Sequence, residues 1–198
     1  MKCIRNLFFM AGGIALASLF SVPILAQAPP MVDGDCAEYS ALHAQNIGIS
    51  KEVGLHIFQD KYFVWFCYTY PDGSFGTADL KMKTKTIPNG LNLHVSAQLG
   101  EWPMDKPELA PKNPESEMWW NHNGWTANPV WINGMDRSGA QARYRFKNAK
   151  AREIQISKRR FGIGEWLFSL EIRSIKGSDG KTFDLTFPTV GEYKLKVK

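Results

Sequence analysis

The sequence has no local motif that would mark a catalytic centre. It contains no His-Glu-x-x-His metal site, nucleophile elbow, Walker loop or dinucleotide-binding glycine fingerprint. Its four histidines, His43, His56, His94 and His122, show no metal-ligand spacing. Carboxylates are numerous enough for glycosidase chemistry, but nothing in the sequence pairs two of them. We therefore predict that the protein is not an enzyme.

Helical periodicity is missing as well. No segment keeps apolar residues on one helical face over a dozen positions, and no internal repeat is visible. Short aromatic and β-branched runs alternate instead with turn residues, and the strongest run spans residues 62–70 before Pro71-Asp72-Gly73. Residues 91–99 and 166–172 alternate apolar and polar side chains. This pattern predicts an all-β fold, an antiparallel β-sandwich of the jelly-roll or immunoglobulin-like kind.

Only one long apolar run is present, from residue 7 to about residue 25. Lys2 and Arg5 precede it and Ala26-Gln27-Ala28 follows it, which are the three parts of an export signal. We predict a signal peptide over residues 1–28 and a single domain over residues 29–198, located in the periplasm or outside the cell. The run is long enough to remain as an anchor if uncut. Once it is cleaved, we expect no stable membrane insertion.

The net charge is small for a chain of this length. The formal charge of +5 falls to 5 − 2 = +3 when Lys2 and Arg5 are removed, because the predicted signal contains no acid. The basic residues gather at residues 147–152 and 158–160, which is typical of a solvated face. The weak balance and the predicted export both argue against nucleic acid as a partner.

Cysteine is equally scarce, and Cys3 falls within the predicted signal. In an oxidising compartment the remaining pair, Cys36 and Cys67, favours a disulfide, and two separately buried thiols are the alternative. Three acids are candidates for a calcium site, since hard cations need clustered oxygen ligands. Turn roles explain these acids equally well. They are Asp33, Asp35 and Asp60.

Tryptophan, by contrast, is concentrated. Five of the seven tryptophans fall between Trp102 and Trp131, in a Pro-, Asn- and Gly-rich stretch over residues 100–136 that we predict to be a long loop. Indole rings offer flat surfaces to the C–H faces of sugars, and amide and imidazole groups hydrogen-bond to hydroxyls. The alternative is that these rings pack against the end of the sandwich. The predicted ligand contacts are Trp119, Trp120, Trp125, Trp131, Asn121, His122, Asn123 and Asn128. Because neighbours in an extended chain face opposite ways, at most one ring of the Trp119–Trp120 pair should reach a ligand.

Four segments share a pattern with a known family. Val32-Asp33-Gly34-Asp35 followed by Tyr39, then residues 60–66, residues 93–96 and residues 164–172, resemble the opening, a strand pair and two later strands of family 9 carbohydrate-binding modules and DOMON-like sandwiches. No proline follows Ile172, which departs from that family's pattern. The resemblance implies a jelly-roll-like sandwich that grips a glycan or polysaccharide between aromatic rings, often beside structural calcium. It does not say which tryptophans do so here.

Two alternatives accompany this prediction of an exported, non-catalytic carbohydrate-binding protein. Related DOMON-like domains bind haem through a methionine and a histidine, which makes Met104, Met118 or Met135 with His94 or His122 candidates, although no spacing singles out a pair. The second alternative is a structural or interaction protein with no small ligand. We expect no required cofactor, with calcium as the one structural ion that the resemblance implies.

Overall fold

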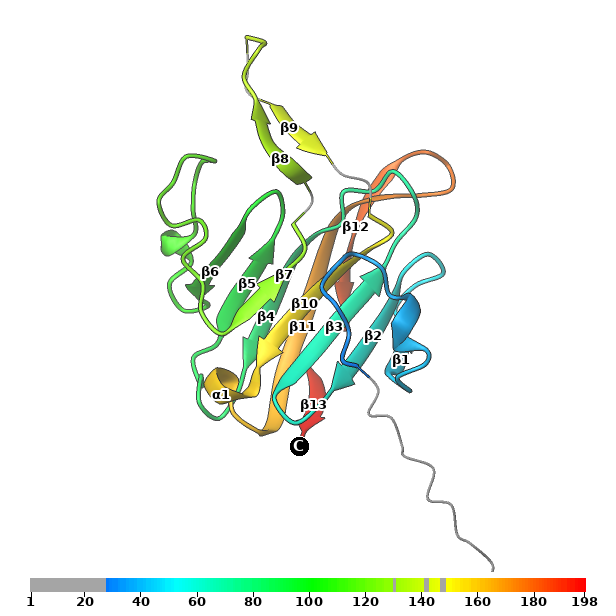
Figure 1. Ribbon diagram of the computed structural model, residues 1–198. Helices are drawn as coiled ribbons and strands as arrows, with labels where there is room; N and C mark the ends of the chain where they lie inside the picture. Colours follow the sequence, from blue (N-terminus) through cyan, green and yellow to red (C-terminus); the bar gives the residue numbers. More distant parts are fainter. Residues whose placement is uncertain (1–27, 130, 141–142, 147–148) are drawn as a thin grey trace, which may run out of the picture.

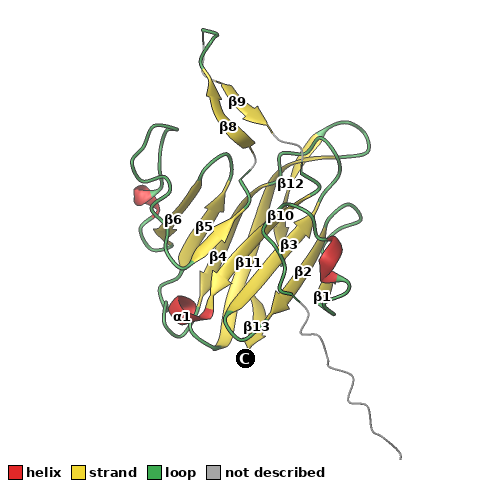
Figure 2. Ribbon diagram, in the orientation of Figure 1, coloured by secondary structure: helices red, strands yellow, loops and turns green. Residues whose placement is uncertain are grey.

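Strands are the main regular secondary structure of the computed structural model, which describes residues 28–129, 131–140, 143–146 and 149–198. The strands are β1 (Gln45–Gly48), β2 (Gly54–Gln59), β3 (Phe63–Thr69), β4 (Thr77–Lys83), β5 (Leu91–Val95), β6 (Leu99–Pro103), β7 (Trp125–Ala127), β8 (Trp131–Asp136), β9 (Arg143–Phe146), β10 (Ala151–Ser157), β11 (Gly164–Lys176), β12 (Thr182–Phe187) and β13 (Tyr193–Val197). Within these ranges, helical structure is limited to η1 (Ala37–Tyr39), η2 (Pro107–Leu109) and α1 (Lys158–Phe161). Figure 2 shows these short helices beside the strands.

Two antiparallel sheets pack face to face. The first sheet has the order β1-β2-β3-β10-β7, and the second has the order β12-β11-β4-β5-β6 with β13 also paired to β11. Figure 1 shows the two layers, with the β8–β9 hairpin extending beyond them. The predicted antiparallel β-sandwich is therefore confirmed.

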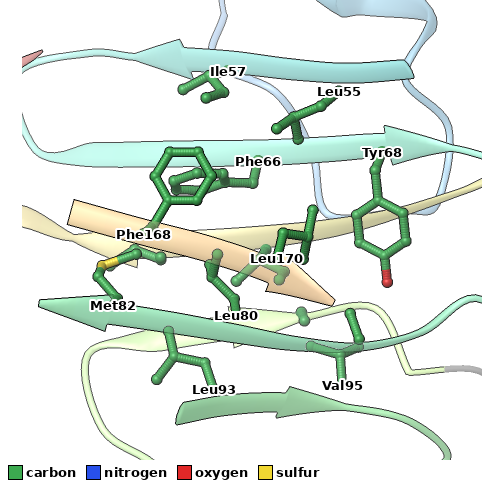
Figure 3. Close-up of a cluster of buried hydrophobic side chains, with 14 of the residues drawn as sticks. Leu55, Ile57, Phe66, Tyr68, Leu80, Met82, Leu93, Val95, Phe168 and Leu170 are labelled. Carbon is green, nitrogen blue, oxygen red and sulfur yellow. The ribbon is translucent and has the colours of Figure 1, made fainter. Parts of the chain in front are cut away.

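The core lies between the sheets because alternate residues of each strand point inward. Leu80 of β4 lies opposite Leu93 of β5, and both are fully buried. Phe66 of the first sheet meets Phe168 of the second edge to face, with ring centroids 5.1 Å apart. Figure 3 shows this cluster. The same alternation leaves the intervening residues on the two outward faces, and those faces carry the candidate sites.

Two segments differ from the sequence-based expectation. The strand predicted over residues 91–99 is two strands, β5 and β6, because Ser96 and Gln98 close a tight turn in which each bonds the other. The long loop predicted over residues 100–136 is also interrupted. It contains η2, β8 and the three-residue β7, which pairs with β10 at the edge of the first sheet. The three residues of β7 are too few to show the alternation of apolar and polar side chains by which a strand is recognised in a sequence.

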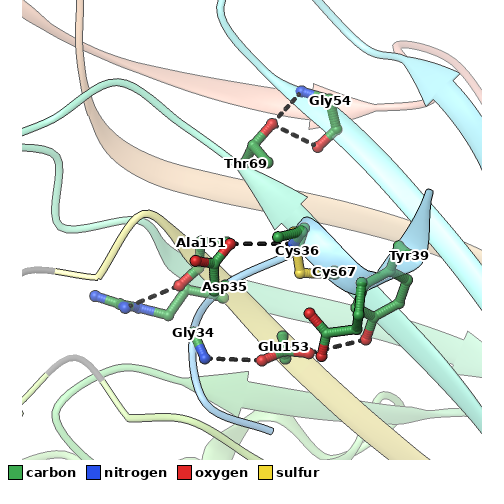
Figure 4. The surroundings of a disulfide bond; sticks show 12 residues. Gly34, Asp35, Cys36, Tyr39, Gly54, Cys67, Thr69, Ala151 and Glu153 are labelled. Atoms are coloured by element: carbon green, nitrogen blue, oxygen red, sulfur yellow. Dashed lines mark hydrogen bonds between the residues drawn. A yellow bond between two sulfur atoms is a disulfide. The ribbon is translucent and has the colours of Figure 1, made fainter. Parts of the chain in front are cut away.

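A disulfide joins Cys36 to Cys67, as predicted. It fixes the segment before η1 to the outward face of β3, where Cys36, Tyr39, Trp65, Cys67 and Ala151 form a second buried cluster. Figure 4 shows this region. The N-terminal segment therefore covers part of the first sheet.

Replacing both cysteines with serine, Cys36→Ser and Cys67→Ser, should lower the free energy of unfolding by about 3–4 kcal/mol, because the disulfide closes a 31-residue separation and restricts the unfolded chain. Urea denaturation followed by tryptophan fluorescence measures the loss. Wild-type protein held in reductant is the matched control and should lose a similar amount. A double variant as stable as the oxidised wild type would contradict the expectation.

No helix among the described residues is both long and apolar enough to cross a bilayer. Residues 1–27 of the predicted signal peptide lie outside the described residues, so its cleavage stays a prediction.

Candidate functional site

Polar and aromatic side chains gather on the outward face of the second sheet. Asn92 of β5 is paired with Trp102 of β6, and Asp79 of β4 is paired with Glu171 of β11, so four adjacent strands contribute to one surface. A groove of about 360 Å³ opens there, and we call it the Trp102 groove. Its lining consists of Asp79, Lys81, Asn92, Trp102, Met104, Pro107, Glu171 and Arg173.

Asp79 organises the floor of this groove. Its side chain is 8% exposed, and Oδ1 accepts hydrogen bonds from Asn92 Nδ2 at 2.6 Å and from His94 Nδ1 at 2.8 Å. Arg173 forms an ion pair with the other carboxylate oxygen. A buried carboxylate is stabilised when such donors surround it. Asp79 therefore fixes the orientation of three neighbouring side chains.

The orientation of Asn92 leaves one acceptor unused. Its Nδ2 donates to Asp79, so Oδ1 points away from that carboxylate. The side chain is 3% exposed, and Asn92 Oδ1 is buried without a hydrogen-bond partner among the described residues. A buried polar atom without a partner costs stability, and a hydroxyl donated by a ligand would satisfy it.

A cluster of rings stands beside this acceptor. The ring of His94 lies 5.7 Å from Trp102 and 5.4 Å from Trp119, centroid to centroid. Trp119 lies over β6 because Gly100 has no side chain there, and a Cβ at Gly100 would come within 3.0 Å of the indole. Trp119 Nε1 donates to the carbonyl of Asn113 at 2.8 Å. The indoles of Trp102 and Trp119 are both half-buried, so each ring is held in place and is still partly open to solvent.

His94 is held in its neutral form. Burial lowers the pKa of His94 to about 4, while the ion pair with Arg173 offsets the charge of Asp79 beside it. The Nδ1–H of neutral imidazole then donates to Asp79, which makes Nε2 the acceptor. At neutral pH the ring cluster therefore carries no charge.

The structure separates the residues predicted to contact a ligand. Trp119 packs beside His94, whereas Trp120 is 50% exposed and its backbone N–H donates to Leu99. Asn121 and Asn123 are also exposed, away from the lining of the Trp102 groove. The side chain of Trp131 lies outside what the structure describes.

Trp125 and its neighbours differ most from the expectation. Trp125 is 5% exposed in the main core, and its Nε1 donates to Glu101 Oε2 at 2.7 Å. The ring of His122 packs 4.9 Å from that of Trp125. Asn128 accepts the backbone N–H of Glu153 at 2.5 Å, so it serves the fold. The inward side of β7 places the indole of Trp125 in the core, whereas the prediction had it facing a ligand; ligand contact by this residue stays a prediction.

The three acids considered for calcium have local roles. Asp33 accepts the backbone N–H of Asp35, Asp35 accepts that of Ala37, and Asp60 accepts those of Tyr62 and Phe63, as turn acids do. In the ranges that the structure describes, no three His, Cys, Asp or Glu side chains gather as a metal site. The described residues therefore include no assembled ligand set for calcium, and calcium binding stays a prediction.

The residues that sequence reasoning missed are Asp79, Asn92, Trp102 and Arg173. Asn92 and His94 are polar members of the alternation over residues 91–99, which places them on one face of that segment. Their partners come from distant strands, and only the order β11-β4-β5-β6 brings them together.

No protein-family model matches the chain, and no curated protein sequence matches it. Among solved structures, the chain is similar to a family 9 carbohydrate-binding module from Caldicellulosiruptor kristjanssonii in complex with cellotriose. The two share 8% sequence identity at a TM-score of 0.43, over 86% of this chain and 91% of that chain. Similarity at this level assigns neither a family nor a ligand to the protein, so the family named from the sequence stays a prediction.

Proposed function

We propose that the protein binds a neutral saccharide in the Trp102 groove and does not cleave it. The observation that carries the proposal is the buried Asn92 Oδ1, an unpartnered acceptor next to the half-buried indole of Trp102. A sugar ring has an apolar C–H face that packs on an indole and hydroxyls at its edge that donate hydrogen bonds. One pyranose ring lying on Trp102 would satisfy both groups at once.

The charges of the groove support a neutral ligand. Lys81 lies 3.7 Å from Glu171, and Arg173 lies 3.4 Å from the same carboxylate. Arg173 also pairs with Asp79, so the two cations and two acids balance. A charged ligand would have to break these pairs, whereas sugar hydroxyls can bridge them.

The same pairing supports binding without catalysis. Asp79 already accepts from Asn92 and His94 and is paired with Arg173, so it has no free proton-transfer role. The Cys36–Cys67 disulfide supports a location outside the cytoplasm. We infer an exported glycan-binding protein.

Trp102→Ala should lower the affinity for the best neutral glycan at least about tenfold, because it removes the stacking surface. A glycan array, with and without calcium, identifies that glycan, and titration calorimetry then measures its affinity. Trp120→Ala is the matched control, since Trp120 is an exposed tryptophan outside the groove lining, and it should bind as wild type.

Equal affinity in Trp102→Ala and wild type would contradict the proposal, as would a folded protein that binds no glycan. A haem absorption band in the purified protein would favour the haem alternative instead. His94 is a poor candidate for that role because its Nδ1 is bonded to Asp79 and its ring contacts Trp102 and Trp119.

A further inference from the structure

We propose that a second cleft, on the outward face of the first sheet, binds a saccharide that carries a carboxylate. This cleft has a volume of about 700 Å³, within the range of small-ligand sites, and we call it the Arg159 cleft. Its lining consists of Phe63, Asn123, Gly124, Trp125, Thr126, Gln155, Ser157, Arg159 and Arg160. It lies on the opposite sheet from the Trp102 groove and does not depend on that site.

Strand pairing builds the floor of the Arg159 cleft. Gln155 of β10 is paired with Thr126 of β7, and Ser157 of β10 is paired with Phe63 of β3, so these four residues share the outward face. Figure 1 shows β3, β10 and β7 side by side with α1 at their end. The covering N-terminal segment reaches Trp65 and Cys67 on β3, and Phe63 lies at the border of that covered cluster.

The charge of this cleft is unbalanced. Its charged lining residues are Arg159 and Arg160, and no carboxylate lines it. Arg160 is already paired, because its two terminal nitrogens donate to Glu101 at 2.7 and 2.6 Å. The exposed guanidinium of Arg159 has no ion-pair or hydrogen-bond partner among the described residues. One free cation therefore faces a cleft without an acid, which complements an anionic ligand.

The planar shape of the Arg159 guanidinium indicates which kind of anion it would bind. A guanidinium presents two parallel N–H donors that match the two oxygens of a carboxylate. Ser157 Oγ accepts the backbone N–H of Arg159 at 3.3 Å, which fixes the start of this side chain at the cleft. A single arginine fork supplies one such contact, so the cleft binds one carboxylate of its ligand.

The remaining polar groups suit hydroxyls. The side chains of Asn123, Thr126 and Gln155 are at the cleft and make no hydrogen bond to another described residue. Amide and hydroxyl groups both donate and accept, as sugar hydroxyls require. Phe63 adds an aromatic wall, held by its contact with Trp65 at 5.5 Å between ring centroids. A carboxylate, several hydroxyls and an apolar ring face together describe a uronic-acid unit.

Titration calorimetry of the full chain with trigalacturonate tests the proposal, and Arg159→Gln should lower the affinity at least about tenfold. Thr126→Trp, which fills the cleft from an exposed strand position, should abolish binding. Lys51→Gln removes the same charge from an exposed turn outside the cleft and should bind as wild type. Trp102→Ala should also bind trigalacturonate as wild type, which separates this site from the Trp102 groove.

Equal losses in Arg159→Gln and Lys51→Gln would overturn the proposal, because they would mean general attraction to a basic surface. Wild-type affinity in Thr126→Trp, loss of binding in Trp102→Ala, or no binding of trigalacturonate by the folded protein would each overturn it too. Loss of binding in Trp102→Ala would place the acidic saccharide in the Trp102 groove, and neutral-glycan binding itself is tested separately by the Trp102→Ala and Trp120→Ala pair.

Discussion

Trp125→Ala is expected to lower the free energy of unfolding by about 3–5 kcal/mol, the range for removing a large aromatic side chain from a core. The indole is 5% exposed and packs in the main core with Ile154 and Ile156. Its Nε1–H also donates to Glu101, a carboxylate shared with Arg160. The substitution therefore opens a cavity and removes one of the donors that fix Glu101.

Urea denaturation of Trp125→Ala and Trp120→Ala provides the comparison. Trp120 is exposed, so its replacement should change the free energy of unfolding by less than about 0.5 kcal/mol. A Trp125→Ala protein as stable as wild type but unable to bind glycan would contradict the placement in the core and restore the interpretation based on composition. Equal destabilisation of both variants would also contradict it.

The fold could be predicted because its signals are local. Residues 62–70 are almost entirely aromatic or β-branched, and the turn Pro71-Asp72-Gly73 ends them. The structure places β3 there, at the centre of the first sheet. The cysteine pairing followed from count and compartment alone. The strand prediction needed only residues that are neighbours in the chain, and the disulfide prediction needed only the number of cysteines and the compartment.

The candidate groove could not be predicted because it depends on strand order. Asp79 and Arg173 are 94 positions apart in the chain, and they meet because β11 pairs with β4. Alternation says which side chains share a face of one strand, but not which strand lies next to it. The same limit hid the role of Gly100, which lets Trp119 lie beside His94.

Tryptophan composition identified the segment rich in indoles, but not which of these rings are buried. Trp102, outside the predicted set of contacts, lines the Trp102 groove, while Trp125 is in the core. An indole suits a ligand platform and a core equally well, so burial decides between the two roles. Burial in turn depends on which side of β7 faces inward, and three residues are too few to show it.

Glu153 should make the stability of the protein depend on pH. Its Oε2 accepts the backbone N–H groups of Asp33 and Gly34 at 2.8 and 2.7 Å, and its Oε1 accepts the hydroxyl of Tyr39 at 2.9 Å. These donors favour the ionised carboxylate, but burial outweighs them and raises the pKa of Glu153 to about 7 from 4.5. Between pH 4.5 and about 7 the folded state therefore holds a proton that the unfolded state has released.

Rising pH across this window then favours unfolding, and Glu153 should account for a loss of about 3 kcal/mol that is complete above pH 7. Other groups act in the opposite sense, since burial lowers the pKa of His94 and its contribution to stability grows as pH rises towards 6.5.

The quantity to measure is therefore the difference in free energy of unfolding between wild type and Glu153→Gln, obtained from urea denaturation at several pH values. In the variant, the amide oxygen can accept the two backbone N–H groups while the amide nitrogen donates to Tyr39. We expect wild type to lose stability relative to Glu153→Gln from pH 4.5 to 7, because only wild type releases this proton on unfolding. Parallel stability curves for the two proteins would mean that Glu153 is ionised throughout the window and that its three donors outweigh burial.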